Sequence, residues 1–151
     1  MAQVEVDNRS ADRVDEAALV AQAEFVLSQL GLHPDTELSI SLVDATEIAE
    51  LHVRWMDLPG PTDVLSFPMD ELRVPEPGHE AEPGMLGDVV ICPEVAAAQG
   101  EQAGHGLDGE LELLLTHGIL HLLGHDHGEP EEHAQMFGLQ DQLLVAWRRQ
   151  G

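Results

Sequence analysis

The sequence predicts an α/β (α+β) fold, a mixed sheet of about four strands with about five helices. Short stretches alternate apolar and polar residues, which is typical of strands. Between them lie longer stretches whose apolar residues recur every three or four positions, which is typical of helices. One helix, over about residues 108–123, is apolar on nearly every side and should be central and buried. At 151 residues and 43% hydrophobic composition, the chain fits one domain over residues 1–151.

The first half of the chain alternates strands and helices. Asp44 looks like a helix N-cap with Glu47 as its reciprocal partner. Glycine after Leu30 and the Pro-Gly-Pro run from Pro59 end the two helices. The predicted elements are a strand at 4–6, a helix at 14–30, a strand at 38–42, a helix from 45 to before 59, and a strand at 63–67.

The second half carries one more strand and the remaining helices. Residues 69–85 are rich in proline and acids and predict an exposed loop. Asp108 is expected to cap the buried helix, and Gly124 to end it in the left-handed conformation. The other predicted elements are a strand at 86–92 with the fully apolar run 89–91, a helix after Pro93, and a final helix from 130 to 149 whose apolar face holds Met136, Leu139, Leu143 and Trp147.

Composition excludes some classes of protein. Six arginines and no lysine face 29 acidic residues, and the net charge of −23 gives no general attraction to nucleic acid, so any RNA role must rest on local chemistry. The lone Cys92 allows no intrachain disulfide. We see no apolar run near the ~18 residues that cross a membrane, so we expect a cytoplasmic protein with no membrane partner.

Histidines cluster in the run from His117 to His127, which reads HGILHLLGHDH. His117 and His121 are four apart and share a helix face, and the turn at Gly124 brings His127 back toward them. Three imidazoles and an open position are the ligand set of a catalytic zinc, which activates a water molecule. We therefore predict one zinc ion per chain on these three histidines, although imidazoles also suit nickel, copper or iron. The histidines outside this cluster are interpreted as surface, loop or solvated helix residues: His33, His52, His79, His105 and His133.

Gly118 distinguishes this motif from that of the metzincin peptidases. Those enzymes space their histidines in the same way, but carry a catalytic glutamate where this chain has Gly118. Glycine inside a helix costs about 1 kcal/mol relative to alanine, which predicts close approach of a strand or a substrate. A peptidase thus becomes the weaker alternative.

The histidine run resembles the signature H-G-x-L-H-L-x-G-[YHF]-D-H of the YbeY family of bacterial rRNA maturation factors. Two further segments are similar to that family, PTDVLSFP at 61–68 and LGDVVI at 86–91. The resemblance implies a zinc-dependent, single-strand-specific endoribonuclease that matures the 3′ end of small-subunit (16S) rRNA and acts in ribosome quality control. It implies as partners single-stranded rRNA, the small ribosomal subunit, and ribosomal proteins or an Era-type GTPase.

The resemblance also implies that Thr62, Asp63 and Ser66 lie near an RNA groove. The alternative is that they only cap a proline-bounded strand. Where many members carry a phosphate-contacting arginine, this chain has Met56. Arg54, two residues earlier, is a candidate substitute, and Arg73 in the following loop is another.

His125 and Asp126 adjoin the third proposed ligand and are candidates for relaying a proton. For Asp126, a hydrogen bond that orients an imidazole is the favoured interpretation. Two other functions stay open beside the endoribonuclease: a ribosome-assembly factor with a mainly structural zinc, and a metallohydrolase acting on a non-RNA substrate such as a peptide. A fourth protein ligand would favour the structural zinc, and an open fourth position would favour an enzyme.

Overall fold

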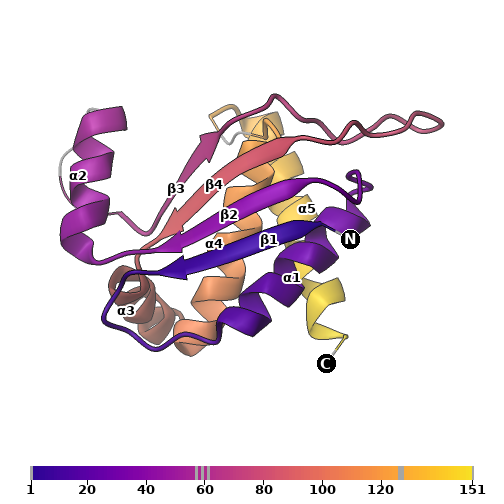
Figure 1. The fold of residues 1–151 in the computed structure, drawn as a ribbon. Helices are drawn as coiled ribbons and strands as arrows, with labels where there is room; N and C mark the ends of the chain where they lie inside the picture. Colours follow the sequence, from indigo (N-terminus) through magenta and orange to yellow (C-terminus); the bar gives the residue numbers. More distant parts are fainter. Residues whose placement is uncertain (1, 57, 59, 61, 126–127, 151) are drawn as a thin grey trace.

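The computed structural model describes residues 2–56, 58, 60, 62–125 and 128–150. Its described elements follow the predicted alternation of strands and helices (Figure 1). They are β1 (Gln3–Asn8), α1 (Glu16–Gln29), β2 (Glu37–Leu42), α2 (Ala45–Met56), β3 (Val64–Pro68), β4 (Met85–Ile91), α3 (Pro93–Ala103), α4 (Gly106–Leu122) and α5 (Pro130–Arg148).

The four strands form one mixed sheet in the order β1-β2-β4-β3. β1 pairs with β2, and β2 with β4, in parallel, whereas β3 runs antiparallel to β4 at the edge. The predicted α/β fold with a four-stranded mixed sheet is therefore confirmed. Residues 69–84, between β3 and β4, contain neither helix nor strand and extend away from the sheet (Figure 1).

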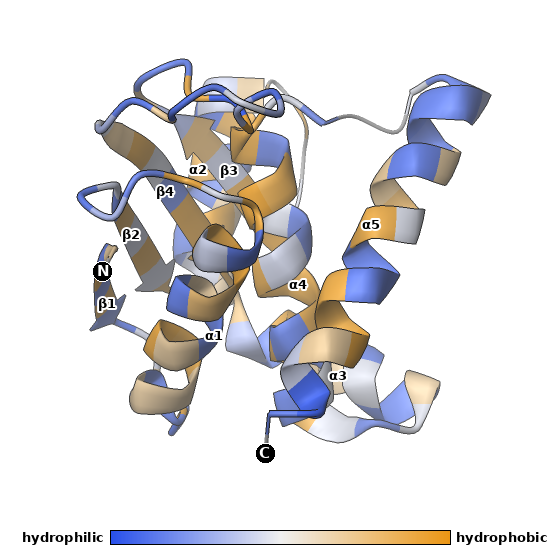
Figure 2. Cartoon of the chain, turned by 90° about the vertical axis from the view of Figure 1, so that its right-hand side faces the viewer, coloured by the Kyte–Doolittle hydropathy of each residue, from blue (hydrophilic) through white to orange (hydrophobic). Residues whose placement is uncertain are grey.

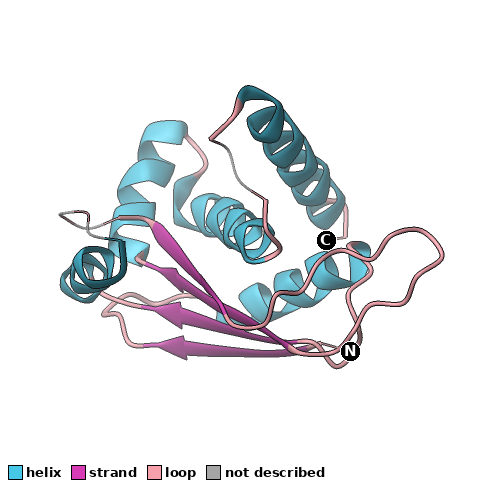
Figure 3. Cartoon of the chain, turned by 90° about the horizontal axis from the view of Figure 1, so that it is seen from above, coloured by secondary structure: helices cyan, strands magenta, loops and turns pink. Residues whose placement is uncertain are grey.

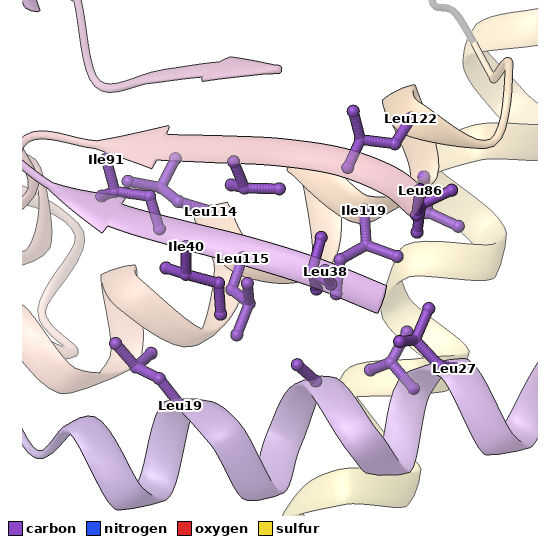
Figure 4. Packing of buried hydrophobic residues seen from close by; sticks show 14 of the residues in the cluster. Leu19, Leu27, Leu38, Ile40, Leu86, Ile91, Leu114, Leu115, Ile119 and Leu122 are labelled. Atoms are coloured by element: carbon purple, nitrogen blue, oxygen red, sulfur yellow. The ribbon is translucent and has the colours of Figure 1, made fainter. Parts of the chain in front are cut away.

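The main core lies between one face of the sheet and the helices α1 and α4, as the view from above shows (Figure 3). Leucine and isoleucine side chains from β2 and β4 point toward those of α1 and α4 (Figure 4). Along α4, hydrophobic residues occur on most sides, while α5 forms an outer layer against α4 and α1 (Figure 2). The predicted central buried helix is thus α4, with Leu115, Ile119 and Leu120 fully buried.

The opposite sheet face carries a smaller cluster. There Ile48 of α2 packs with the buried residues Leu65 and Val90. Side chains alternate between the two faces along a strand, so these two residues point away from the main core. No helix in the described part of the chain is long and apolar enough to cross a membrane.

Two predicted helix caps differ from the structure. α4 begins at Gly106 after the N-cap residue His105, so the expectation that Asp108 caps it is wrong. Gly106 has a φ of 71°, and the helix begins at this residue, earlier than predicted. Asp108 lies in the first turn, where its negative charge still suits the helix dipole. At α2 the Glu47 carboxylate pairs with Arg9 instead of closing a capping box with Asp44.

Candidate active site

The middle of α4 brings two histidines together. His117 and His121 lie one turn apart and are half-buried, and their Nε2 atoms are 3.1 Å apart. The two rings meet edge to face with centroids 4.6 Å apart. The i, i+4 spacing has therefore placed both imidazole nitrogens toward one point, as the sequence predicted.

That point opens onto a cavity of about 350 Å³. α4 supplies the two histidines, and the edge strand β3 with the residue before it supplies most of the rest. Met56, from the end of α2, closes one side. The cavity is lined by Met56, Asp63, Val64, Leu65, Ser66, His117 and His121. A histidine pair that faces an edge strand across a cleft lined by both polar and apolar side chains is a candidate catalytic site.

Gly118 lets the sheet come close to this helix. A Cβ atom at position 118 would lie 2.7 Å from Cγ1 of Val89 and 3.2 Å from Oγ of Ser66. The Ser66 hydroxyl donates a hydrogen bond of 3.0 Å to the Gly118 carbonyl oxygen. The predicted close approach is therefore that of a strand. The same contact leaves no room for the glutamate of a peptidase motif.

α5 supports the histidine pair from the other side. Gln140, one turn before Leu144, is buried, and its Oε1 lies 2.9 Å from Nδ1 of His117. The Phe137 ring lies 5.7 Å from the His117 ring and stacks on His133 at 4.4 Å. Sequence reasoning missed Gln140. A polar residue four positions after Met136, within the apolar stripe of the last helix, was the signal that could have revealed it.

The turn after α4 forms as predicted at Gly124, which has φ of 94°. The Arg73 guanidinium from the loop rests on this glycine, where an added Cβ would meet its Nε and Cζ at 2.8 Å. His125 follows half-buried, with its backbone N–H donating to the Leu120 carbonyl at 3.0 Å. Asp126 and His127 lie outside the described residues.

Asp63 faces the cavity but is held by the protein. Its Oδ1 accepts from the backbone N–H of Val64 at 2.7 Å and from the Thr62 hydroxyl at 3.4 Å. With the Gln99 amide oriented so that its nitrogen faces both carboxylates, it donates to Asp63 Oδ2 at 3.2 Å and to Glu110 Oε2 at 2.8 Å. These contacts support the strand-capping interpretation of Thr62 and Asp63.

A buried acid of α4 completes this network. Glu110 is 5% exposed, and its Oε1 lies 2.6 Å from Nε2 of His105. His105 is thus an exposed residue in the bend before α4, as the sequence suggested, and it is also the partner of Glu110. Sequence reasoning also missed Glu110, whose place among the leucines of α4 was the available signal.

Arg54 lies apart from the histidine cavity. It is exposed on α2, with its guanidinium carbon 5.3 Å from the centroid of the Trp55 ring. Met56 lines the cavity, two residues further along. The structure thus places Arg54 on the neighbouring surface of α2, outside the cavity lining.

The two histidines fit a tetrahedral metal ion. Two Zn–N bonds of about 2.0–2.1 Å at a tetrahedral angle place their nitrogens roughly 3.3 Å apart. The 3.1 Å between the two Nε2 atoms agrees with that spacing. Among the described residues no three His, Cys, Asp or Glu side chains gather to hold an ion. The predicted third ligand, His127, belongs to the part that the structure does not describe.

Fold and site together define a class: an α/β protein of the hydrolase type, whose histidine pair faces a cleft at a strand edge. The family described as Endoribonuclease YbeY matches residues 5–148, and the chain belongs to it. The resemblance carried by the histidine run is thereby confirmed. Members of this family are named as enzymes that cleave RNA chains internally, which makes the chain a member of a hydrolase family.

Several relatives are similar over nearly the whole chain. "Endoribonuclease YbeY" of Thermobifida fusca is 60% identical over 97% of this chain and 94% of its own length. The protein of the same name from a Nocardioides species is 56% identical, covering 96% and 97% respectively. The solution structure of TM1509 from Thermotoga maritima superposes with a TM-score of 0.62 at 25% identity, over 99% of this chain and 93% of that one.

Proposed function

We propose that the chain is a zinc-dependent endoribonuclease that cleaves single-stranded RNA and matures the 3′ end of 16S rRNA in the cytoplasm, as one domain over residues 1–151. One observation carries the metal-dependent part: the Nε2 atoms of His117 and His121 meet 3.1 Å apart at the wall of the cleft beside β3. Membership of a family named for endoribonuclease activity supports the RNA substrate.

In this proposal His117, His121 and His127 hold the ion. A bound zinc supplies a Lewis acid that activates water and offsets charge on a phosphate. The chain's own contribution is to fix the two imidazoles on a buried helix, so that both nitrogens face the cleft without rearrangement. Asp126 is proposed to orient an imidazole, and His125, half-buried beside it, is a candidate for moving a proton.

The RNA is proposed to lie in the cleft along β3. Ser66 already donates to Gly118, so its hydroxyl oxygen offers an acceptor to the substrate. Thr62 and Asp63 shape the rim through the contacts that hold them in place. A single strand fits this arrangement, because a cleft of about 350 Å³ has room for about one nucleotide and none for a duplex.

Phosphate contact has to come from scattered arginines. Arg73 is the better placed, since its guanidinium lies on Gly124, three residues before the proposed third ligand in the sequence, and is in no ion pair with another described residue. Arg54 stands further away on α2 and suits a neighbouring nucleotide, with the exposed Trp55 beside it as a stacking surface. The small ribosomal subunit, with a ribosomal protein or an Era-type GTPase, is proposed to present the RNA, because the net charge of −23 gives the enzyme no long-range attraction to it.

The test compares the parent chain, purified without a histidine tag, with the double variant His117→Ala/His121→Ala. The metal content and the cleavage of matched single-stranded and double-stranded RNA oligonucleotides are measured on both. We expect about one zinc per chain and cleavage of the single strand for the parent, and neither for the variant. Metal without cleavage would favour a structural zinc in an assembly factor. A parent chain that is folded and free of metal would overturn the proposal.

A further inference from the structure

The amide of Gln140 lies at the back of the histidine pair, away from the cleft. It comes from α5, its side chain is 3% exposed, and its Oε1 is 2.9 Å from Nδ1 of His117. Burial of an amide without a partner costs free energy, and on this helix the neighbouring positions Met136 and Leu144 are apolar. A glutamine at this place is therefore best explained by the hydrogen bond that it makes.

This hydrogen bond decides which nitrogen of His117 carries the proton. A neutral imidazole has one N–H and one lone pair, and the partner of one nitrogen selects the role of the other. The Gln140 carbonyl oxygen can only accept, so Nδ1 carries the hydrogen and donates it. The lone pair is left on Nε2, the atom that faces Nε2 of His121.

We propose that Gln140 is a positioning residue that fixes His117 in the tautomer and ring orientation needed to bind a metal through Nε2. The inference rests on the proposed metal site and extends it to a residue of the last helix. Ligand histidines generally donate their second nitrogen to a carboxylate, a carbonyl or water. Here the acceptor is a neutral side-chain amide, held in place as α5 packs on α4 with Phe137 against the same imidazole.

Three variants separate positioning from packing. Gln140→Leu keeps a side chain of similar volume and removes the acceptor. Gln140→Glu keeps an acceptor that cannot donate. Gln22→Leu is the matched control, because Gln22 is also buried against α4 and bonds Thr116, the neighbour of His117, without contacting either histidine.

Two quantities are measured on each protein. The Kd for zinc comes from competition with a chromophoric chelator, and the tautomer of His117 comes from ¹⁵N NMR shifts of the imidazole nitrogens in metal-free protein. We expect Gln140→Leu to weaken zinc binding about 10- to 100-fold and to lose the pure Nδ1–H tautomer. Gln140→Glu should retain both the affinity and the tautomer. Gln22→Leu should leave both unchanged, even where its thermal unfolding temperature falls as much as that of Gln140→Leu.

The outcomes distinguish this inference from the proposed function. If the parent binds zinc and Gln140→Leu binds it with the same Kd, the role of Gln140 is refuted and the metal site stands. Loss of affinity in Gln140→Glu as well would mean that the amide donates to His117, which also refutes it. If the parent binds no zinc, the proposed metal site fails. The NMR tautomer in Gln140→Leu, compared with the parent, then still decides whether Gln140 orients the ring.

Discussion

Replacing Gly118 with alanine tests the close contact between α4 and the sheet. The new Cβ would lie 2.7 Å from Cγ1 of Val89, and real Cβ atoms do not approach so closely. Val89 cannot easily move aside, because it is fully buried and its β-branched side chain is stiff at χ1. Overpacking of this kind costs about 1–3 kcal/mol. Alanine also recovers about 1 kcal/mol of helix propensity, so we expect a net loss of about 0–2 kcal/mol.

Gly138 offers the matched control. It lies inside α5, and nothing stands within 4 Å of a Cβ added there. Gly138→Ala should therefore stabilise the protein by up to about 1 kcal/mol, the propensity gain alone. The difference between the two variants isolates the cost of the contact, which we expect to be about 1–3 kcal/mol.

The free energy of unfolding is measured in urea, with a chelator present so that bound metal does not contribute. A third protein, Gly118→Ala in a Val89→Ala background, should show a smaller cost for the alanine, because the atom it meets is gone. The reasoning is refuted if Gly118→Ala and Gly138→Ala stabilise the protein equally. That result would mean that the strand leaves room for a side chain at 118.

Three further predictions concern side chains around the sheet and α4. Burial raises the pKa of Asp88 above its ordinary 3.8, so the folded state holds this proton more tightly and stability is lost as pH rises through the folded pKa. Asp88→Asn should therefore raise Tm at neutral pH, with the gain vanishing below about pH 4 in a pH series of thermal melts. Ser66→Ala removes the hydrogen bond to Gly118 and should cost about 1 kcal/mol in urea unfolding, and an unchanged midpoint would contradict it. His105→Ala leaves the buried Glu110 without its closest partner and should cost about 1–3 kcal/mol, whereas His79→Ala at an exposed position of the loop should not.

The elements of the fold could be predicted because each carries its own local signal. Apolar spacing identified α4 as the buried helix, and glycine chemistry identified the turn at Gly124. Helix starts were less predictable. Asp108 is a good cap by residue type, but the left-handed Gly106 starts the helix two residues earlier. Such choices depend on backbone conformation that residue type alone does not determine.

The residues of the candidate site also fall into those that the sequence could predict and those that it could not. Spacing on one helix was enough to bring His117 and His121 together. Gln140 and Gln99 were missed, because their partners lie on other elements of the fold and no local pattern joins them. A rule that flags polar residues within apolar helix stripes would have found Gln140 and Glu110. It would not have named their partners, which only the packing of α3, α4 and α5 decides.

The two outer strands have a consequence for self-association. A strand at the edge of a sheet offers unpaired backbone groups to another copy, and proteins guard such edges against aggregation. β3 is only five residues long and ends at Pro68, which cannot donate to a neighbouring strand. β1 at the other edge exposes Glu5 and Asp7, so two copies aligned there would bring like charges together. The excess of acids that makes RNA binding difficult thus also keeps the sheet from growing at the β1 edge.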